Sequence, residues 1–152
     1  MDSQVLELLG RNRLIDELLR AGLEVALPVR DRGVDLIAYA DLNLTSFTAC
    51  PIQMKAYSGC GFSIDAKYAK FPSLLLAHIW YIDAPEDEVT FAMTCPEALA
   101  VSDLMGWTKT ASWGKGYYAN TSPGMKLREL LEPYRMSRDS WWPKVARVVG
   151  RG

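Results

Sequence analysis

Two short stretches decide the fold, Gly33-Val-Asp-Leu-Ile-Ala38 and Ile52-Gln-Met-Lys55. Each stretch carries polar side chains within an otherwise apolar run: Asp35 in the first, Gln53 and Lys55 in the second. A charge in a buried strand is unfavourable unless it is paired or binds a metal, so these positions are candidates for a functional site. Side chains alternate across a strand, which puts Gln53 and Lys55 on one face and the methionine between them on the other.

The chain around these stretches predicts helices and strands in a simple order. Apolar residues recur at helical spacing over residues 2–21, and Gly22 stands where a helix C-cap belongs. Strands are expected at residues 23–29, 34–39 and 47–57, with a loop at 41–44, and then at 74–82 and 89–94. A short helix is expected at 64–71, ended by Pro72, and two more helices follow, one opening at Pro96 and one with Ser122 as N-cap and Pro123 at its first position. The strand at 74–82 is apolar nearly throughout, which favours burial on both faces.

Residues 5–82 resemble the PD-(D/E)XK nuclease superfamily, in the variant that carries Gln in place of the usual second acid. The resemblance rests on the two quoted stretches and on the order helix, three strands, helix, strand. It implies an α/β protein with a restriction endonuclease-like αβββαβ core, in which helices flank a mixed central sheet. We expect residues 1–152 to form a single domain, with a core at about 5–95 and a helical, aromatic-rich extension at about 96–152 packed on it.

The resemblance also implies a metal site and a reaction. Asp35, the amide oxygen of Gln53 and the carbonyl of Met54 would bind Mg²⁺ or Mn²⁺, the cations that suit oxygen ligands. Lys55 would orient the attacking water and stabilise charge on the phosphate. The family usually adds a Glu from the first helix; the expected position is occupied by Arg11, and Glu7 lies one turn earlier on the same face, so Glu7 is a candidate ligand and catalytic residue.

These residues also have structural alternatives. Asp35 could instead cap the turn at Arg32 or pair with Arg30, the Gln53–Lys55 pair could face solvent on an edge strand, and Glu7 could be a solvated helix residue. The only histidine, His78, lies in an apolar strand and is expected to be a core residue, which argues against Ser-His-Asp or Cys-His catalysis.

Basic and aromatic residues define a possible nucleic-acid surface. The net charge of −1 excludes a uniformly basic protein, so any basic patch must be local. The candidates are Arg11, Arg13, Arg30, Arg32, Lys67 and Lys70. A second group interleaves aromatic and basic residues and could stack on bases or simply cover the sheet: Trp107, Lys109, Trp113, Lys115, Tyr117 and Tyr118.

The sequence is compatible with two functions from different classes. The first is a Mg²⁺-dependent endonuclease acting on DNA, expected to be a homodimer because cutting both strands needs two sites. The second is a catalytically inactive nuclease-like module that binds nucleic acid or protein; an oligomer built on an apolar C-terminal surface is a further option. No apolar run reaches about 18 residues and no signal peptide is evident, so a cytoplasmic location without membrane association is expected, with Cys50, Cys60 and Cys95 reduced and mostly buried.

Overall fold

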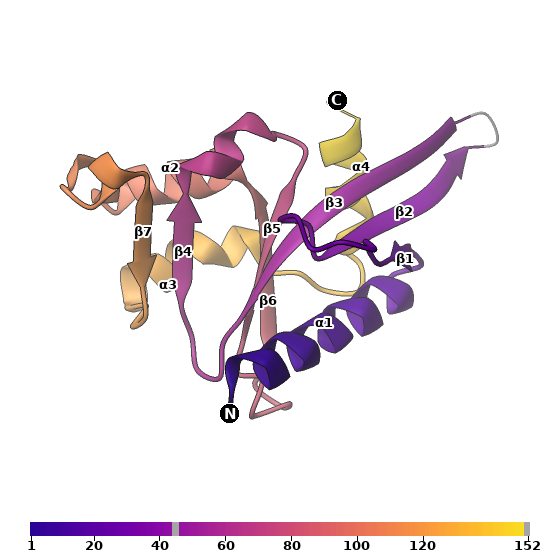
Figure 1. The fold of residues 1–152 in the computed structure, drawn as a ribbon, viewed down its shortest axis with the longest axis horizontal. Coiled ribbons are helices and arrows are strands. Elements are labelled where there is room, and N and C mark those ends of the chain that lie inside the picture. The colour runs from indigo at the N-terminus through magenta and orange to yellow at the C-terminus, as the bar shows by residue number, and fades with distance from the viewer. Residues whose placement is uncertain (44–45, 151–152) are drawn as a thin grey trace.

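The computed structural model describes residues 1–43 and 46–150 and has a mixed five-stranded sheet at its centre (Figure 1). The strands lie in the order β1-β2-β3-β5-β6, with only β3 and β5 parallel. Their bounds are Glu24–Ala26 (β1), Leu36–Asn43 (β2), Ser46–Ala56 (β3), Leu75–Trp80 (β5) and Val89–Thr94 (β6). The predicted α/β class with helices flanking a mixed sheet is confirmed.

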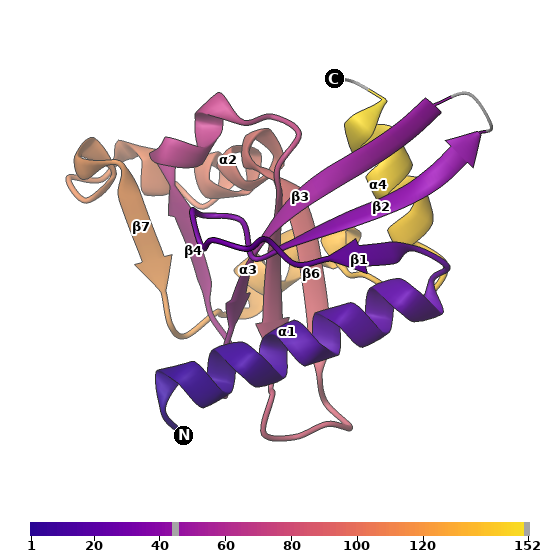
Figure 2. The same cartoon turned by 45° about the vertical axis from the view of Figure 1, so that its right-hand side comes forward.

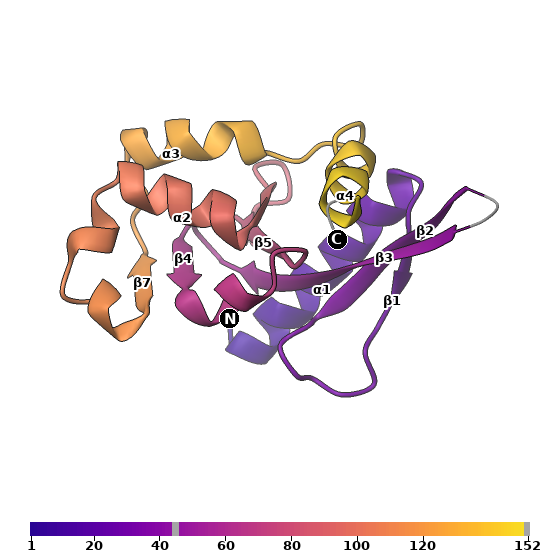
Figure 3. The same cartoon turned by 90° about the horizontal axis from the view of Figure 1, so that it is seen from above.

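Helices cover both faces of this sheet (Figure 3). Helix α1 (Ser3–Arg20) and helix α4 (Trp141–Val149) contribute Leu14, Leu18 and Trp141 to one hydrophobic cluster. On the opposite face, α2 (Cys95–Leu104) and α3 (Met125–Leu131) pack into a second cluster, together with a small sheet formed by β4 (Phe62–Asp65) and β7 (Tyr117–Asn120). All six residues of β5 are buried between the two clusters, as its sequence predicts.

At residues 64–71 the structure differs from the short helix that the sequence predicts. Instead of an α-helix, the chain forms β4 and then a short 3₁₀-helix, Ala66–Lys70 (η1). Phe62 and Ile64 are both buried, a spacing of two that fits a strand, and β4 pairs with β7, which is more than fifty residues away. The connection from β3 to its parallel neighbour β5 therefore runs through a strand and a 3₁₀-helix.

Other differences concern element boundaries. Strand β1 is only three residues long and β2 begins at Leu36, so Asp35 precedes its strand. β2 continues to Asn43, into the predicted loop at 41–44, whose last residue lies outside the described residues. Helix α3 has Gly124 as N-cap in place of Ser122, which leaves Pro123 ahead of the helix, and α4 has no counterpart in the sequence prediction.

The C-terminal half begins with a well-defined helix start. Thr94 is the N-cap of α2 and forms a reciprocal capping box with Glu97. The helix begins one residue before the predicted start at Pro96. Three further 3₁₀-helices connect the elements: Trp107–Lys109 (η2), Trp113–Lys115 (η3) and Glu132–Tyr134 (η4). Among the described residues, no helix is both long and apolar enough to span a bilayer.

Candidate metal centre

Asp35 is fixed where the ladder between β2 and β3 begins. The last regular pair is Leu36 with Ile52, and the backbone N–H of Asp35 donates to the Ile52 carbonyl at 2.9 Å. Its side chain accepts the backbone N–H of Met54 through Oδ2 at 2.7 Å. The carboxylate is therefore held against the β3 backbone, next to the residues that the sequence singles out.

Glu7 and Asp31 join Asp35 at this point. One carboxylate oxygen from each of the three residues lies within 4.8 Å of the other two. Glu7 comes from the first turns of α1, which crosses the sheet beside β3 (Figure 2). The approach is close at Gly10, where a Cβ atom would lie 2.5 Å from the Cβ of Ala56, so this glycine lets the helix bring Glu7 to Asp35.

Asp31 is the member of the cluster that sequence reasoning missed. It lies on the exposed loop between β1 and β2, and its Oδ1 accepts the N–H of Gly33 at the long distance of 3.5 Å. Gly33 has φ of +94°, a left-handed conformation that glycine adopts without strain. The Asp-x-Gly pattern predicts such a turn but does not say which way the carboxylate points.

The electrostatics of the cluster raise the pKa of Asp35 above its ordinary value. Burial of the carboxyl is the largest cause, the Met54 N–H opposes it, and the charges of Asp31 and Glu7 raise the pKa further. Arg11 lowers it only weakly. In the part of the chain that the structure describes, none of the three carboxylates forms an ion pair, so their negative charges are not balanced by a direct contact with Lys or Arg.

The cluster opens into a depression of about 470 Å³. Besides the three acids, its lining includes Gln53, Met54 and Lys55 from the end of β3. The Gln53 Nε2 donates to the Met54 carbonyl at 3.4 Å, so the amide nitrogen of Gln53, and not its expected ligand oxygen, faces this carbonyl. Three carboxylates within one ion's reach are the donors that Mg²⁺ and Mn²⁺ prefer, so the residues present fit a divalent cation. Ligation by Gln53 and Met54 stays a prediction.

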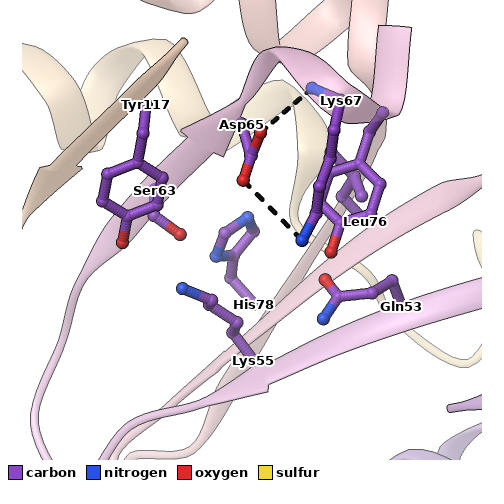
Figure 4. A pocket seen from close by; sticks show the side chains of 9 residues that line it. Gln53, Lys55, Ser63, Asp65, Lys67, Leu76, His78 and Tyr117 are labelled. Atoms are coloured by element: carbon purple, nitrogen blue, oxygen red, sulfur yellow. Dashed lines mark hydrogen bonds and ion pairs between the residues drawn. The ribbon is translucent and has the colours of Figure 1, made fainter. Parts of the chain in front are cut away.

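Lys55 extends from β3 toward a second cavity on the other face of the strand (Figure 4). Its neighbour across the parallel pair is His78, which is 3% exposed and stacks on Phe62 with 4.8 Å between ring centroids. Burial lowers the pKa of His78 to about 3, and the charge of Lys55 lowers it as well. The prediction that His78 is a core residue is confirmed, and the ring also lines the second cavity.

The predicted basic residues divide into three groups. Arg30 and Arg32 are exposed on the loop that carries Asp31, and Arg11 is half-buried near Asp35. Lys67 and Lys70 are exposed on η1, beside the second cavity, with Lys67 Nζ 3.8 Å from the Asp65 carboxylate. Arg13 is instead engaged in ion pairs within the protein, with Glu17 and Glu88.

The aromatic segment mainly covers the second hydrophobic cluster. Trp107 is buried and stacks on Tyr118 at 4.5 Å, and Trp113 packs against the same cluster. Tyr117 differs, because its side chain is exposed and lines the second cavity. Cys50, Cys60 and Cys95 are all free, with Cys50 and Cys95 buried, as expected.

Comparisons with protein-family models, with curated proteins and with solved structures found no match for this chain. The interpretation of the site is therefore based on its residues alone.

Proposed function

We propose that this protein is a metal-dependent endonuclease that hydrolyses phosphodiester bonds in DNA, with a restriction endonuclease-like core. The observation that carries the proposal is the convergence of Glu7, Asp31 and Asp35 in a depression that Lys55 also lines. Phosphodiester hydrolysis needs a group that neutralises the phosphate and a group that activates water, and a divalent cation beside a lysine provides both.

The acids would hold Mg²⁺ or Mn²⁺. Glu7, Asp31 and Asp35 supply carboxylate oxygens, and the Gln53 amide and the Met54 carbonyl are further candidate ligands. When bound, the cation supplies a Lewis acid that polarises the phosphate and favours loss of a proton from the attacking water. The Met54 N–H bond to Asp35 keeps one ligand in place before any cation arrives, which reduces the cost of assembling the site.

The remaining residues position the substrate. The Lys55 ammonium would stabilise charge on the phosphate and orient the attacking water. Arg30 and Arg32 lie on the loop that carries Asp31, where they can contact neighbouring phosphates without reading sequence. Arg11, Lys67 and Lys70 would extend this contact. A homodimer would place two such sites on the two strands of a duplex.

Nicking of a supercoiled plasmid in Mg²⁺ or Mn²⁺ tests the proposal. Asp35→Asn and Lys55→Met should each reduce the rate at least about 100-fold, the range for loss of an electrostatic group at a reacting centre. Matched controls are Asp83→Asn and Lys126→Met, which change exposed residues that do not line the depression and should cut like the unmodified protein. Undiminished cleavage by both site variants would overturn the proposal.

The second candidate function is a nuclease-like module that binds nucleic acid or protein without cutting. The net charge of −1 favours it, because strong nonspecific DNA binders are usually basic. Crystals soaked in Mn²⁺ separate the two directly: anomalous signal between Glu7, Asp31 and Asp35 supports catalysis. Binding of DNA with no signal and no cleavage would favour the module.

A further inference from the structure

The second cavity lies between the main sheet and the small sheet, on the opposite face of β3 from the side chain of Met54. It has a volume of about 180 Å³. Figure 4 shows side chains reaching it from four strands and η1: Lys55 and Gln53 from β3, Ser63 and Asp65 from β4, His78 from β5 and Tyr117 from β7. Elements far apart in the sequence thus converge on one small space lined by both polar and apolar groups.

Its polar groups are fixed by contacts inside the protein. Ser63 and His78 are only 8% and 3% exposed, and the Tyr57 hydroxyl lies 3.3 Å from His78 Nδ1. Burial is the main reason that the pKa of Tyr57 rises to about 12, so this hydroxyl keeps its proton at neutral pH. Asp65 accepts the backbone N–H of Lys67 at 3.0 Å. The cavity therefore presents preorganised hydrogen-bond donors and acceptors.

The charges of the cavity suit an uncharged heteroaromatic ring better than a phosphate. Lys55 and Lys67 bring positive charge, but Asp65 places a carboxylate between them and would repel an anion (Figure 4). His78 is neutral, and the Tyr117 ring, 44% exposed, stands at the mouth with Lys55 Nζ 5.6 Å from its centroid. A nucleobase combines a flat face for stacking with an edge of donors and acceptors.

The size of the cavity points to a single ring. An engineered protein cavity of roughly 150 Å³ holds benzene. A space of about 180 Å³ therefore accommodates a six-membered ring with its substituents, the dimensions of a pyrimidine.

The two cavities share part of their walls, because Gln53 and Lys55 line both. A phosphate at the acidic cluster would therefore have an adjoining nucleotide within reach of the second cavity. We propose that this cavity receives one unstacked nucleobase, of pyrimidine size, from the strand whose phosphate lies at Glu7, Asp31 and Asp35. The inference rests on the proposed function, and it makes the substrate a single strand or a locally unpaired duplex, since a paired base cannot enter.

NMR of the single histidine tests this without any cleavage. His78 is the only histidine of the chain and lines the cavity, so its ring Cε1–H signal is a direct reporter. The protein is titrated in EDTA with a thymidine tetranucleotide and with an abasic tetranucleotide that has the same phosphates. We expect a saturable shift of the His78 signal with the thymidine oligomer only. An adenosine tetranucleotide should bind at least several-fold more weakly.

Two variants complete the experiment. Tyr117→Ala should weaken thymidine binding about tenfold, the order of one base–aromatic stack, while Phe71→Ala, an exposed aromatic outside the cavity, should not change it. Equal shifts with the abasic oligomer, or unchanged affinity in Tyr117→Ala, would overturn the base site, and equal affinity for adenosine would overturn its pyrimidine size. Because the titration contains no metal ion, it can detect a base site even if the protein does not cleave plasmid DNA. Plasmid cleavage can likewise be observed in a protein that shows no base site.

Discussion

Two groups of carboxylates lie along α1, and they differ in whether they form ion pairs within the described part of the protein. Near its C-terminal end, Glu17 and Glu88 share Arg13, whose nitrogens lie 3.4 and 3.1 Å from their oxygens. Near its N-terminal end, Glu7 meets Asp31 and Asp35 within 4.8 Å, and the described residues supply none of these acids with an ion-pair partner. The first group carries its own cation, whereas the second leaves room for one from solution.

The pKa values of Glu17 and Asp35 show the same contrast. Burial raises the pKa of Glu17 and of Asp35, and it is the largest cause in both. Around Glu17 the neighbours oppose this rise: a hydrogen bond from Thr90, the charge of Arg13 and a hydrogen bond from Trp141. Around Asp35 the neighbouring acids add to it. A site that is unfavourable for its own charges when empty gains the most from a bound cation.

The largest effect is expected when the positive charge of Arg13 is removed. Arg13→Met should lower the free energy of unfolding by about 3 kcal/mol, because it leaves Glu17 and Glu88, only 12% and 10% exposed, without their partner. Urea denaturation at pH 7 measures the loss. The loss should shrink as the pH is lowered, since the pKa of Glu17 is raised above its ordinary value and the protonated form needs no cationic partner.

The control for this variant is Arg20→Met on the same helix. Arg20 pairs with Asp16 four residues earlier, and both side chains are largely exposed, so the expected change is only about 0.5 kcal/mol. Equal stability of Arg13→Met and the unmodified protein would remove the contrast between the two acidic groups.

The next effect concerns the contact that brings Glu7 to Asp35. In Gly10→Ala the new Cβ would lie 2.5 Å from the Cβ of Ala56, and the helix has to move to relieve the clash. We expect a loss of about 2 kcal/mol in unfolding free energy, as for other overpacked sites, together with weaker Mn²⁺ binding measured by calorimetry. Gly59→Ala is the matched control, because nothing lies within 4 Å of its added Cβ. Unchanged Mn²⁺ affinity in a folded Gly10→Ala protein would contradict the role of this contact.

The sequence predicted the part of the candidate site that lies on regular structure. Alternation along β3 placed Gln53 and Lys55 on one face, and the helical period of α1 kept Glu7 as a candidate one turn from the expected position. Asp31 could not be predicted, because the direction of its side chain depends on how the loop before β2 folds back over α1. The second cavity was also out of reach, since it depends on β4 pairing with the distant β7.

The prediction of the fold from the sequence was limited in the same way. The long strands and α1 have strong periodic patterns and were predicted within a few residues, apart from the short β1. The prediction for residues 64–71 was wrong because the partner that makes β4 a strand, β7, lies far along the chain. Gly10 carried no local signal, because its role is defined by Ala56 on another element.

A smaller effect is expected when Mn²⁺ is added. The raised pKa of Asp35 means that its ionised form is less favourable in the folded than in the unfolded chain. The protonated form of Asp35 therefore stabilises the folded protein. This contribution to stability is fully present below the ordinary pKa of 3.8 and is lost as the pH rises through the raised pKa. Mn²⁺ should reverse this loss, raising stability by about 1.4 kcal/mol at ten times its Kd.

Thermal unfolding with and without Mn²⁺ at pH 7 and pH 4.5 measures this effect. The increase in Tm should be larger at pH 7, because protons compete with the cation for Asp35 at lower pH. Asp35→Asn should show no Mn²⁺-dependent increase at either pH, and NaCl at equal ionic strength serves as the control for screening. A rise in Tm that is the same in Asp35→Asn would place the cation elsewhere.

The smallest effect distinguishes the two acidic groups in the absence of metal. Glu7→Gln removes one of three neighbouring negative charges, so in EDTA the variant should be slightly more stable than the unmodified protein, with Tm higher by about 1 °C. Glu24→Gln changes an exposed acid on β1, outside the cluster, and should leave Tm unchanged. In Mn²⁺ the order should reverse, because Glu7→Gln binds the cation more weakly and gains less from it. A residue kept at a cost to the empty protein and needed only by the loaded one belongs to a binding site; a Glu7→Gln protein that is less stable in EDTA would instead make Glu7 a structural residue like Glu17.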